Sequence, residues 1–215
     1  MKRKIKIKVC GNKENANDVA LLQPDYMGFI FYKDSPRNFD TVPPAPDENI
    51  KKVGVFVNPS IEEILEKIEL FQLDIIQLHG NESPQFCEEL RNASLSDRKQ
   101  SVEIWKVFSI DDQFNFEELE CYEAVADKFL LDTKGEHKGG NGYTFNWKLL
   151  EKYTSKKQFI LSGGIGIDQL TMLKDILNSD LPVYAVDVNS KFELGPGLKN
   201  VDGLKSFIES IKNPV

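Results

Sequence analysis

Apolar and polar residues alternate strictly at the start of the chain. From Lys4 to Gly11 the sequence is Lys-Ile-Lys-Ile-Lys-Val-Cys-Gly. A period of two is typical of a strand that buries one face, and the glycine ends the pattern. The alternation predicts a strand that ends at Cys10 and places this thiol on the face of the lysines. Because a cysteine is usually a small buried hydrophobe, Cys10 is a candidate for packing as well as for chemistry.

Seven further apolar runs follow, and segments with helical spacing lie between most of them. The further predicted strands are Tyr26–Tyr32, Lys52–Asn58, Asp74–Gly80, Glu103–Ser109, Lys128–Thr133, Gln158–Gly164 and Val183–Ser190. The predicted helical segments are Asn15–Leu22, Pro59–Gln72, Pro84–Leu90, Phe114–Asp127, Asn146–Tyr153, Ile167–Leu177 and Val201–Ile211. The stretch from Lys33 to Asn49 holds four prolines and is predicted to be mostly loop.

Strands that alternate with helices predict a parallel sheet, and eight such units favour a closed (β/α)8 TIM barrel over an open doubly wound sheet. No linker or change in composition interrupts the alternation, so we expect a single α/β domain over residues 1–215. No Gly-x-Gly-x-x-Gly motif follows the first strand, which argues against dinucleotide binding.

Composition narrows the class of partner. The chain has 40% hydrophobic and 28% charged residues and a net charge of -7, so it has material for a core and no bulk attraction for nucleic acid. No apolar stretch approaches the roughly 18 residues of a membrane span, and no signal peptide is evident. We therefore expect a cytoplasmic protein with free thiols and no membrane partner, in which Cys87 and Cys121 pack inside helical segments.

Polar residues stand at the ends of the predicted strands, where barrels of this kind form their active sites. In chain order they are Cys10, Tyr32 with Arg37 beyond it, Asn58, His79, Ser109, Asp132, the pair Gly163-Gly164, and Asn189-Ser190. A Gly-Gly turn after the seventh strand, beside the end of the eighth, occupies the usual phosphate position of the fold, where backbone N–H groups approach the anion. These residues predict a small phosphorylated substrate.

Cys10 and Asp132 come from different strands and can approach one ligand from two sides. A thiolate that accepts a proton and a carboxylic acid that donates one are suited to an isomerisation, which needs no net redox change. Asp132 could instead cap a helix or brace a loop, and His79 could be a structural hydrogen-bonding residue. His137, in the glycine-rich loop 134–142, is expected to be solvated. No cluster has the spacing of metal ligands, so no metal site is predicted.

The alternation also concerns Lys8, which shares the face of Cys10. A cation on the inner face needs a partner, and Asp187 on the eighth strand would lie beside the first strand in a closed barrel. We hypothesise that Asp187 holds Lys8 in place and that Lys8 lowers the pKa of the Cys10 thiol. The alternative is that Lys8 points outward with its neighbours.

Short motifs on successive strands resemble one known family, phosphoribosylanthranilate isomerase of tryptophan biosynthesis. They are Lys8-Val-Cys-Gly11, Gly28-Phe-Ile-Phe-Tyr32, Val53-Gly-Val-Phe-Val-Asn58, Gln77-Leu-His-Gly80, Leu131-Asp-Thr133, Leu161-Ser-Gly-Gly-Ile165, Val186-Asp-Val-Asn-Ser190, and Glu193 with Pro196-Gly-Leu-Lys199. The resemblance implies a cofactor-free Amadori rearrangement of N-(5-phosphoribosyl)anthranilate into 1-(2-carboxyphenylamino)-1-deoxyribulose 5-phosphate.

The resemblance also implies roles for individual residues. Asp132 matches the general acid that protonates the ribose ring oxygen, and Cys10 matches the general base that removes the C2′ proton. Arg37 matches the residue that meets the anthranilate carboxylate. The positions that match the phosphate site are Gly163, Gly164, Asn189 and Ser190, and His79 joins the candidate substrate-binding residues.

Three departures from the family pattern are visible. Lys191 stands where the family often has glycine, which raises the question of a left-handed backbone there. Asn146 replaces a common aspartate, with little expected effect because both residues cap helices. The segment between Gly11 and Gly28 is about two residues short, so the first helix is expected to be trimmed.

Two other functions stay open at this point. One is the related histidine-pathway sugar isomerase, which runs the same chemistry on a larger ribonucleotide and resembles a version with carboxylates at both strand ends. The other is a phosphate-binding barrel without turnover. A monomer is the expected oligomeric state, with a homodimer as the alternative.

Overall fold

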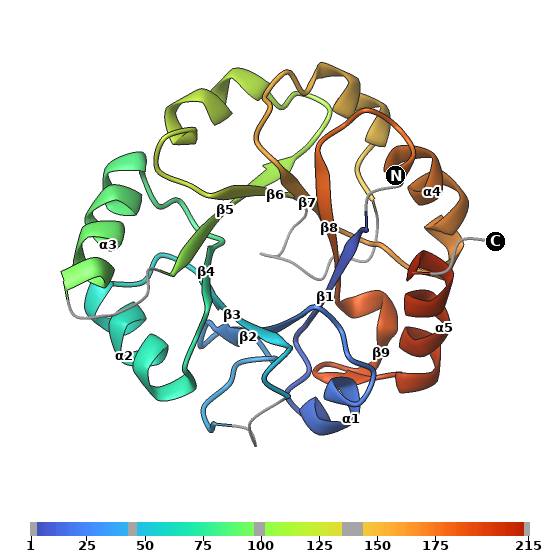
Figure 1. The fold of residues 1–215 in the computed structure, drawn as a ribbon, viewed down its shortest axis with the longest axis horizontal. Coiled ribbons are helices and arrows are strands. Elements are labelled where there is room, and N and C mark those ends of the chain that lie inside the picture. Colours follow the sequence, from blue (N-terminus) through green and yellow to red (C-terminus); the bar gives the residue numbers. More distant parts are fainter. Residues whose placement is uncertain (1–3, 43–46, 97–101, 135–143, 213–215) are drawn as a thin grey trace.

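The structure, a computed structural model, describes residues 4–42, 47–96, 102–134 and 144–212. Within these ranges eight strands, β1 to β8, close into a barrel in the order of the sequence, and helices surround it (Figure 1). Each neighbouring pair is parallel, including β8 with β1. The predicted (β/α)8 barrel is confirmed.

The barrel strands lie inside the predicted ranges or within two residues of them. They are β1 (Lys6–Cys10), β2 (Tyr26–Phe31), β3 (Lys51–Phe56), β4 (Ile75–Leu78), β5 (Glu103–Ile110), β6 (Lys128–Thr133), β7 (Phe159–Leu161) and β8 (Val183–Val188). Strand β7 is shorter than predicted because Gly163 and Gly164 adopt φ angles of 87° and 65°. These left-handed conformations end the extended backbone before the turn.

The helices include segments that are tighter than predicted. The α-helices are α1 (Ala16–Ala20), α2 (Ile61–Phe71), α3 (Pro84–Ser96), α4 (Leu170–Leu177) and α5 (Val201–Lys212). The predicted helix Phe114–Asp127 is a 3-10 helix, η1 (Phe116–Tyr122), and the predicted helix Asn146–Tyr153 is a 3-10 helix, η2 (Trp147–Lys152). Glutamates three residues apart along η1 repel one another, which disfavours a longer α-helix there. Helix α1 has five residues, so the first helix is indeed short.

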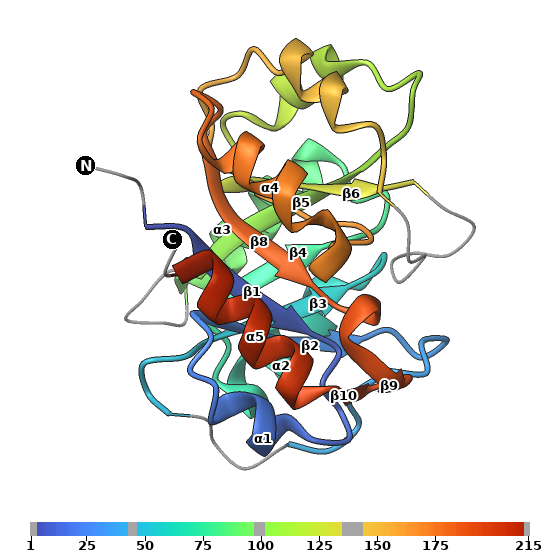
Figure 2. The same ribbon diagram turned by 90° about the vertical axis from the view of Figure 1, so that its right-hand side faces the viewer.

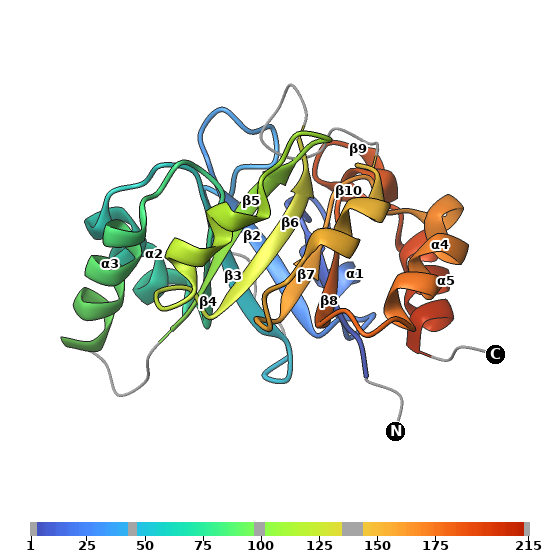
Figure 3. The same cartoon turned by 90° about the horizontal axis from the view of Figure 1, so that it is seen from above.

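A small hairpin after β8 was not predicted. A 3-10 helix, η4 (Ser190–Phe192), leads into β9 (Glu193–Gly195), which pairs antiparallel with β10 (Leu198–Lys199). Gly197 turns the chain with a φ of 85°, which a glycine adopts without strain. The hairpin lies on the rim toward which β5 and β6 point (Figure 3), and α5 runs along the outside of β1 and β8 (Figure 2).

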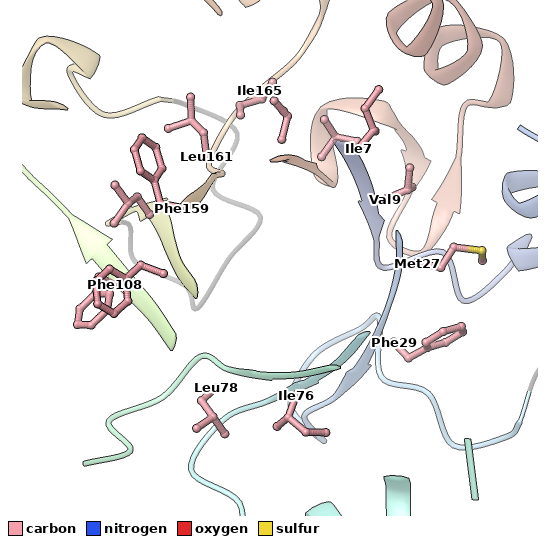
Figure 4. Close-up of a cluster of buried hydrophobic side chains, with 14 of the residues drawn as sticks. Ile7, Val9, Met27, Phe29, Ile76, Leu78, Phe108, Phe159, Leu161 and Ile165 are labelled. Carbon is pink, nitrogen blue, oxygen red and sulfur yellow. The ribbon is translucent and has the colours of Figure 1, made fainter. Parts of the chain in front are cut away.

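The outward faces of the strands form the main core against the helices. Ile7, Val9, Met27 and Phe29 alternate with inward residues on β1 and β2 and are almost completely buried. Figure 4 shows these side chains with others of the same cluster, around the ring of strands. The predicted burial of the isoleucine face of β1 is thereby confirmed.

The inward faces change from apolar to polar along the strands. Toward the N-terminal ends of the strands, the interior of the barrel is filled by a second apolar cluster. It consists of Tyr26, Val53, Ile75, Trp105, Val107, Leu130, Ile160 and Ala185. Two residues further along their strands come buried polar side chains, Gln77 after Ile75 and Asp187 after Ala185. The barrel therefore places its polar side chains near the end where its strands terminate.

Two further expectations concern what lies around the barrel. Within the described ranges no helix has the length and apolar character to cross a membrane. Of the glycine-rich loop predicted at 134–142, only Lys134 belongs to the described residues, and His137 lies outside them.

Candidate active site

One cavity at the C-terminal ends of the strands, open to solvent, gathers the residues to which the sequence analysis gave a catalytic or substrate-binding role. Its lining includes Cys10, Arg37, His79, Asp132, Gly163, Gly164, Asn189 and Ser190. Residues from β1, β4, β6 and the segments after β2, β7 and β8 thus meet in one place. Asn58 and Ser109, which also stood at predicted strand ends, do not line this cavity.

Cys10 lies at the end of β1 beside a buried ion pair. Lys8 Nζ is 2.8 Å from Asp187 Oδ2, and the Lys8 side chain has no exposed surface. Register places Lys8 directly opposite Asp187 on β8. Gly28 on β2 leaves room for this group, because a Cβ atom there would lie 2.8 Å from Cys10 Sγ and 3.1 Å from Lys8 Cε. The predicted Lys8–Asp187 pair is therefore present.

Two opposing effects act on the pKa of the Cys10 thiol. Burial raises the pKa of the Cys10 thiol, and Lys8 opposes the rise without cancelling it. Burial also lowers the pKa of Lys8, but the charges of Asp187 and Cys10 outweigh it and raise that pKa. Lys8 thus acts on the thiol in the direction we expected. The net pKa of the thiol is nevertheless raised, because desolvation of the charged form is the larger effect.

Asp132 faces the same cavity from the end of β6. Its Oδ2 is 3.3 Å from His79 Nε2, and its Oδ1 accepts a hydrogen bond of 3.0 Å from the backbone N–H of Thr133. Both side chains are largely buried, with 7% of Asp132 and 11% of His79 exposed. His79 therefore contacts the candidate acid directly, and the next helix that the structure describes, η2, is capped by Asn146 and not by Asp132.

The turn after β7 and the end of β8 form the candidate phosphate position. A Cβ atom on Gly163 would collide with Thr133, so only glycine fits this approach. Asn189, Ser190 and Lys191 line the cavity beside it. Lys191 is not among the described non-glycine residues with positive φ, so its place in the sequence requires no left-handed backbone. The structure instead adds its ammonium-bearing side chain to the cavity wall.

Arg37 belongs to a cluster of charges on the rim. Its Nε and Nη2 donate to Glu193 on β9, with Nη2 2.6 Å from Oε2. Lys199 on β10 is fully buried and donates to Glu193 Oε1 at 2.8 Å and to Asn189 Oδ1 at 2.7 Å. Burial raises the pKa of Glu193, but Arg37 and Lys199 outweigh it and lower that pKa. Glu193 is therefore an anion held between two cations.

Some residues in the cavity or directly behind its lining were missed from the sequence. Glu193 and Lys199 entered only through the family resemblance, because the short hairpin that carries them has no periodic pattern. The Pro196-Gly197 dipeptide was a turn signal that could have revealed it. Gln77, on the inner face of β4, was also passed over, although it lies two residues before His79 and so shares its face.

The other two thiols have different surroundings. Cys87 on α3 is buried, as expected, whereas Cys121 on η1 is exposed, so the expectation that it packs was wrong. The 3-10 geometry of η1 turns a different face to the core than an α-helix would. Among the described residues, no three His, Cys, Asp or Glu side chains are grouped so that they could hold a metal ion.

Comparisons with known proteins agree with this geometry. Residues 5–210 match the family model of N-(5'phosphoribosyl)anthranilate (PRA) isomerase. The chain is 41% identical to N-(5'-phosphoribosyl)anthranilate isomerase of Parabacteroides distasonis, over 97% of this chain and 94% of the relative. It is 35% identical to the Campylobacter jejuni protein of the same name, over 97% of this chain and 99% of the relative.

Solved structures show the same relationship. Phosphoribosyl anthranilate isomerase of Thermotoga maritima superposes with a TM-score of 0.78 at 31% identity, covering 97% of this chain and 98% of that one. A further structure, with a TM-score of 0.75 at 28% identity and 97% and 98% coverage, is phosphoribosyl anthranilate isomerase in complex with reduced 1-(o-carboxyphenylamino)-1-deoxyribulose 5-phosphate. By its family match, its relatives and its fold, this chain belongs to the N-(5'-phosphoribosyl)anthranilate isomerase family.

Proposed function

We propose that this protein converts N-(5-phosphoribosyl)anthranilate into 1-(2-carboxyphenylamino)-1-deoxyribulose 5-phosphate, as a step of tryptophan biosynthesis. The observation that carries the proposal is the convergence of the Cys10 thiol and the Asp132 carboxyl on one cavity. The two groups come from β1 and β6, on different sides of the barrel mouth. One proton donor and one proton acceptor are what an aldose–ketose isomerisation requires.

The proposed reaction uses the two groups in sequence. Asp132, in its acid form, donates a proton to the ribose ring oxygen, and the C1′–O bond breaks to give a protonated Schiff base. Cys10, as the thiolate, removes the C2′ proton, and the resulting enolamine tautomerises to the amino ketone. No electron leaves or enters the substrate, so the chemistry needs no redox cofactor. His79, 3.3 Å from Asp132, is proposed to orient the acid and contact the substrate.

Two polar ends of the cavity suit the two anionic ends of this substrate. The Gly163-Gly164 turn, Asn189 and Ser190 are proposed to bind the phosphate through backbone N–H and side-chain donors. Arg37 is proposed to bind the anthranilate carboxylate, since a guanidinium can meet a carboxylate with two parallel hydrogen bonds.

Two buried acceptors of the cavity suit the sugar between these ends. Asp187 Oδ1 and Gln77 Oε1 are buried and have no hydrogen-bond partner among the described residues. Buried acceptors without partners are unfavourable, and substrate hydroxyl groups can supply the missing donors. We propose that they bind the ribose hydroxyls of the opened sugar.

The test follows anthranilate-derivative fluorescence while the purified protein acts on freshly generated N-(5-phosphoribosyl)anthranilate. We expect the wild type to remove the substrate faster than its spontaneous decay. Cys10→Ala and Asp132→Asn should each lose about 100-fold or more in rate, the usual contribution of a positioned acid or base. Both variants should still bind the reduced product analogue.

The matched control is Cys121→Ala, which removes an exposed thiol outside the cavity and should keep the wild-type rate. A folded wild type without turnover would overturn the proposed activity. It would leave the phosphate-binding barrel or the histidine-pathway substrate as the next reading to test.

A further inference from the structure

The Glu193 carboxylate accepts hydrogen bonds from one edge of the Arg37 guanidinium. Its two oxygens accept from Nε at 2.9 and 3.1 Å, and Oε2 also accepts from Nη2 at 2.6 Å. Only 5% of the Glu193 side chain is exposed, so this is a largely dehydrated contact. A carboxylate in this position fixes the plane of the guanidinium as well as its charge.

The contact with Glu193 leaves the Nη1/Nη2 edge of Arg37 available to bind a ligand. A guanidinium carries five N–H donors, and Glu193 engages one on Nε and one on Nη2. Nη1 has no hydrogen-bond partner in the part of the chain that the structure describes. Because Arg37 lines the cavity, the donors that it can offer to a ligand are those of the Nη1/Nη2 edge.

Lys199 contacts Glu193 and connects it to Asn189, which lines the cavity. Its ammonium group, which is fully buried, bridges Glu193 Oε1 and Asn189 Oδ1. Gly11 lies against the same assembly, because a Cβ atom there would be 2.8 Å from both Arg37 Cδ and Asn189 Oδ1. One network therefore spans the carboxylate end and the phosphate end of the proposed substrate site.

We propose that Glu193, braced by Lys199, is a positioning residue that makes the site selective for a substrate with a carboxylate on its aromatic ring. It does so by fixing the orientation of Arg37, so that the N–H donors of the Nη1/Nη2 edge point into the cavity before the ligand binds. The inference rests on the proposed function, and in particular on the contact between Arg37 and the anthranilate carboxylate. The charges of the cluster agree with this proposal. Arg37 and Lys199 are cations and Glu193 is an anion, so one positive charge remains to pair with the carboxylate of the ligand.

A positioning role and a purely electrostatic role of Glu193 predict opposite changes in the affinity for a carboxylate ligand when Glu193 is replaced. Glu193→Gln takes away a negative charge beside Arg37, and by Coulomb's law alone a carboxylate ligand should then bind more tightly. If Glu193 positions Arg37, the same ligand binds more weakly, because a mobile arginine must be ordered by the ligand itself.

The experiment measures binding of two probes that differ only in the carboxyl group. The first is reduced 1-(o-carboxyphenylamino)-1-deoxyribulose 5-phosphate, and the second is the corresponding phenylamino compound without the carboxyl. We expect Glu193→Gln to weaken the first about tenfold and the second less than about threefold, a difference in the range of one charged hydrogen bond. Glu193→Asp, which keeps the charge but is shorter, should show the same selective loss.

Three further variants complete the design. Arg37→Met should abolish the preference for the carboxylated probe, and adding Glu193→Gln to it should change nothing more, because the pair acts as a unit. Glu103→Gln is the matched control. Glu103 is a half-buried carboxylate at the N-terminal end of β5, away from the cavity, where it pairs with Lys128 of β6, and its substitution should leave both affinities unchanged.

The outcomes are distinguishable. A wild type that binds both probes equally would remove the Arg37–carboxylate contact from the proposed function and the inference with it. If Arg37→Met loses the preference but both Glu193 variants keep it, the inference fails and the proposed function stands. Equal weakening of both probes by the Glu193 variants would also overturn the inference, since it would indicate a general structural role.

Discussion

The thiol of Cys10 combines two opposing influences that a single substitution can separate. Burial raises its pKa, and the Lys8 cation limits the rise. Lys8→Met removes the cation, and Asp187, left buried without a partner, is then expected to take up a proton. Because Lys8 lowers the thiol pKa more than Asp187 raises it, losing both charges should raise that pKa further. We expect slower thiolate chemistry near neutral pH.

The pH dependence of Cys10 alkylation measures this effect directly. Iodoacetamide modification of a Cys121→Ser background, followed by peptide mass spectrometry, reports Cys10 apart from the exposed thiol. The inflection of the rate should move to higher pH in Lys8→Met, and the rate of isomerisation near neutral pH should fall with it. Superimposable alkylation profiles in the two proteins would show that Lys8 has no influence on the thiol.

Much of this residue group could be predicted from the sequence. The period of two on β1 put Lys8 and Cys10 on one face, and closure of the barrel put Asp187 opposite Lys8. The net sign of the thiol pKa could not be predicted, because it depends on how completely the group is desolvated. That property is set by Gly28 and the neighbouring strands, which no local pattern describes.

At the scale of elements, one buried ion pair connects the segments after β3 and β4 to the middle of β5. Glu82 and Lys106 lie 3.0 Å apart, with 2% and 4% of their side chains exposed. Glu82 Oε1 accepts from the backbone N–H groups of Asn58, after β3, and Gly80, after β4. Lys106, on β5, also donates to the carbonyl of Gly80 at 2.9 Å. The pair thereby holds the segment that carries His79.

We predict that Glu82→Gln lowers the free energy of unfolding by about 3 kcal/mol, because it removes the carboxylate from a buried ion pair with Lys106. In Glu82→Gln/Lys106→Met the loss should be smaller than the sum of the two single losses. Urea denaturation followed by circular dichroism measures all three values.

The matched control is the exposed pair between Lys134 and Asp111, 2.6 Å apart. Asp111→Asn should cost much less than Glu82→Gln, because water screens the charges of a solvated ion pair. If Glu82→Gln proved as mild as Asp111→Asn, the buried pair would not be what holds the segments after β3 and β4 against β5.

The elements themselves were predictable where a pattern is strong. The barrel strands and α2 have clear periods, and the capping box of Ser60 and Glu63 marks the start of α2. The segments η1 and η2 carry helix-forming residues, but only six or seven of them become helical, and in the tighter 3-10 form. The hairpin of β9 and β10 is too short for a period, and its charged contacts are made with Arg37 far along the chain.

At the scale of the whole molecule, the barrel buries several acidic groups in their neutral form. Burial raises the pKa of the Cys10 thiol, that of Cys87 to about 11, and those of Tyr122 and Tyr153 to about 12. In the unfolded chain these thiols and phenols ionise near their ordinary values, between about 8.5 and 10. The unfolded state therefore binds fewer protons than the folded state above that range.

The sign of the resulting pH dependence follows from linkage. A group whose pKa is raised by folding contributes full stability below its unfolded pKa and loses it as the pH rises toward its folded pKa. We predict that the free energy of unfolding falls from about pH 8.5 upward, by up to about 1.4 kcal/mol per pH unit for each fully buried group and by less for Tyr122, which water partly screens. Urea denaturation at a series of pH values between about 7 and 11 measures the slope.

The slope can be assigned to a group by comparing two cysteine variants. Cys87→Ala lowers stability at every pH, because the smaller side chain leaves a cavity. It also removes one titrating thiol. Between the pKa of the unfolded thiol and about 11, the slope of stability against pH should therefore be shallower in this variant by about 1.4 kcal/mol per pH unit. Cys121→Ala, which removes an exposed thiol, should follow the wild-type slope. Equal slopes in all three proteins would mean that Cys87 gains no protonation advantage from folding, and the alkaline loss would then arise from the remaining buried thiol and the tyrosines.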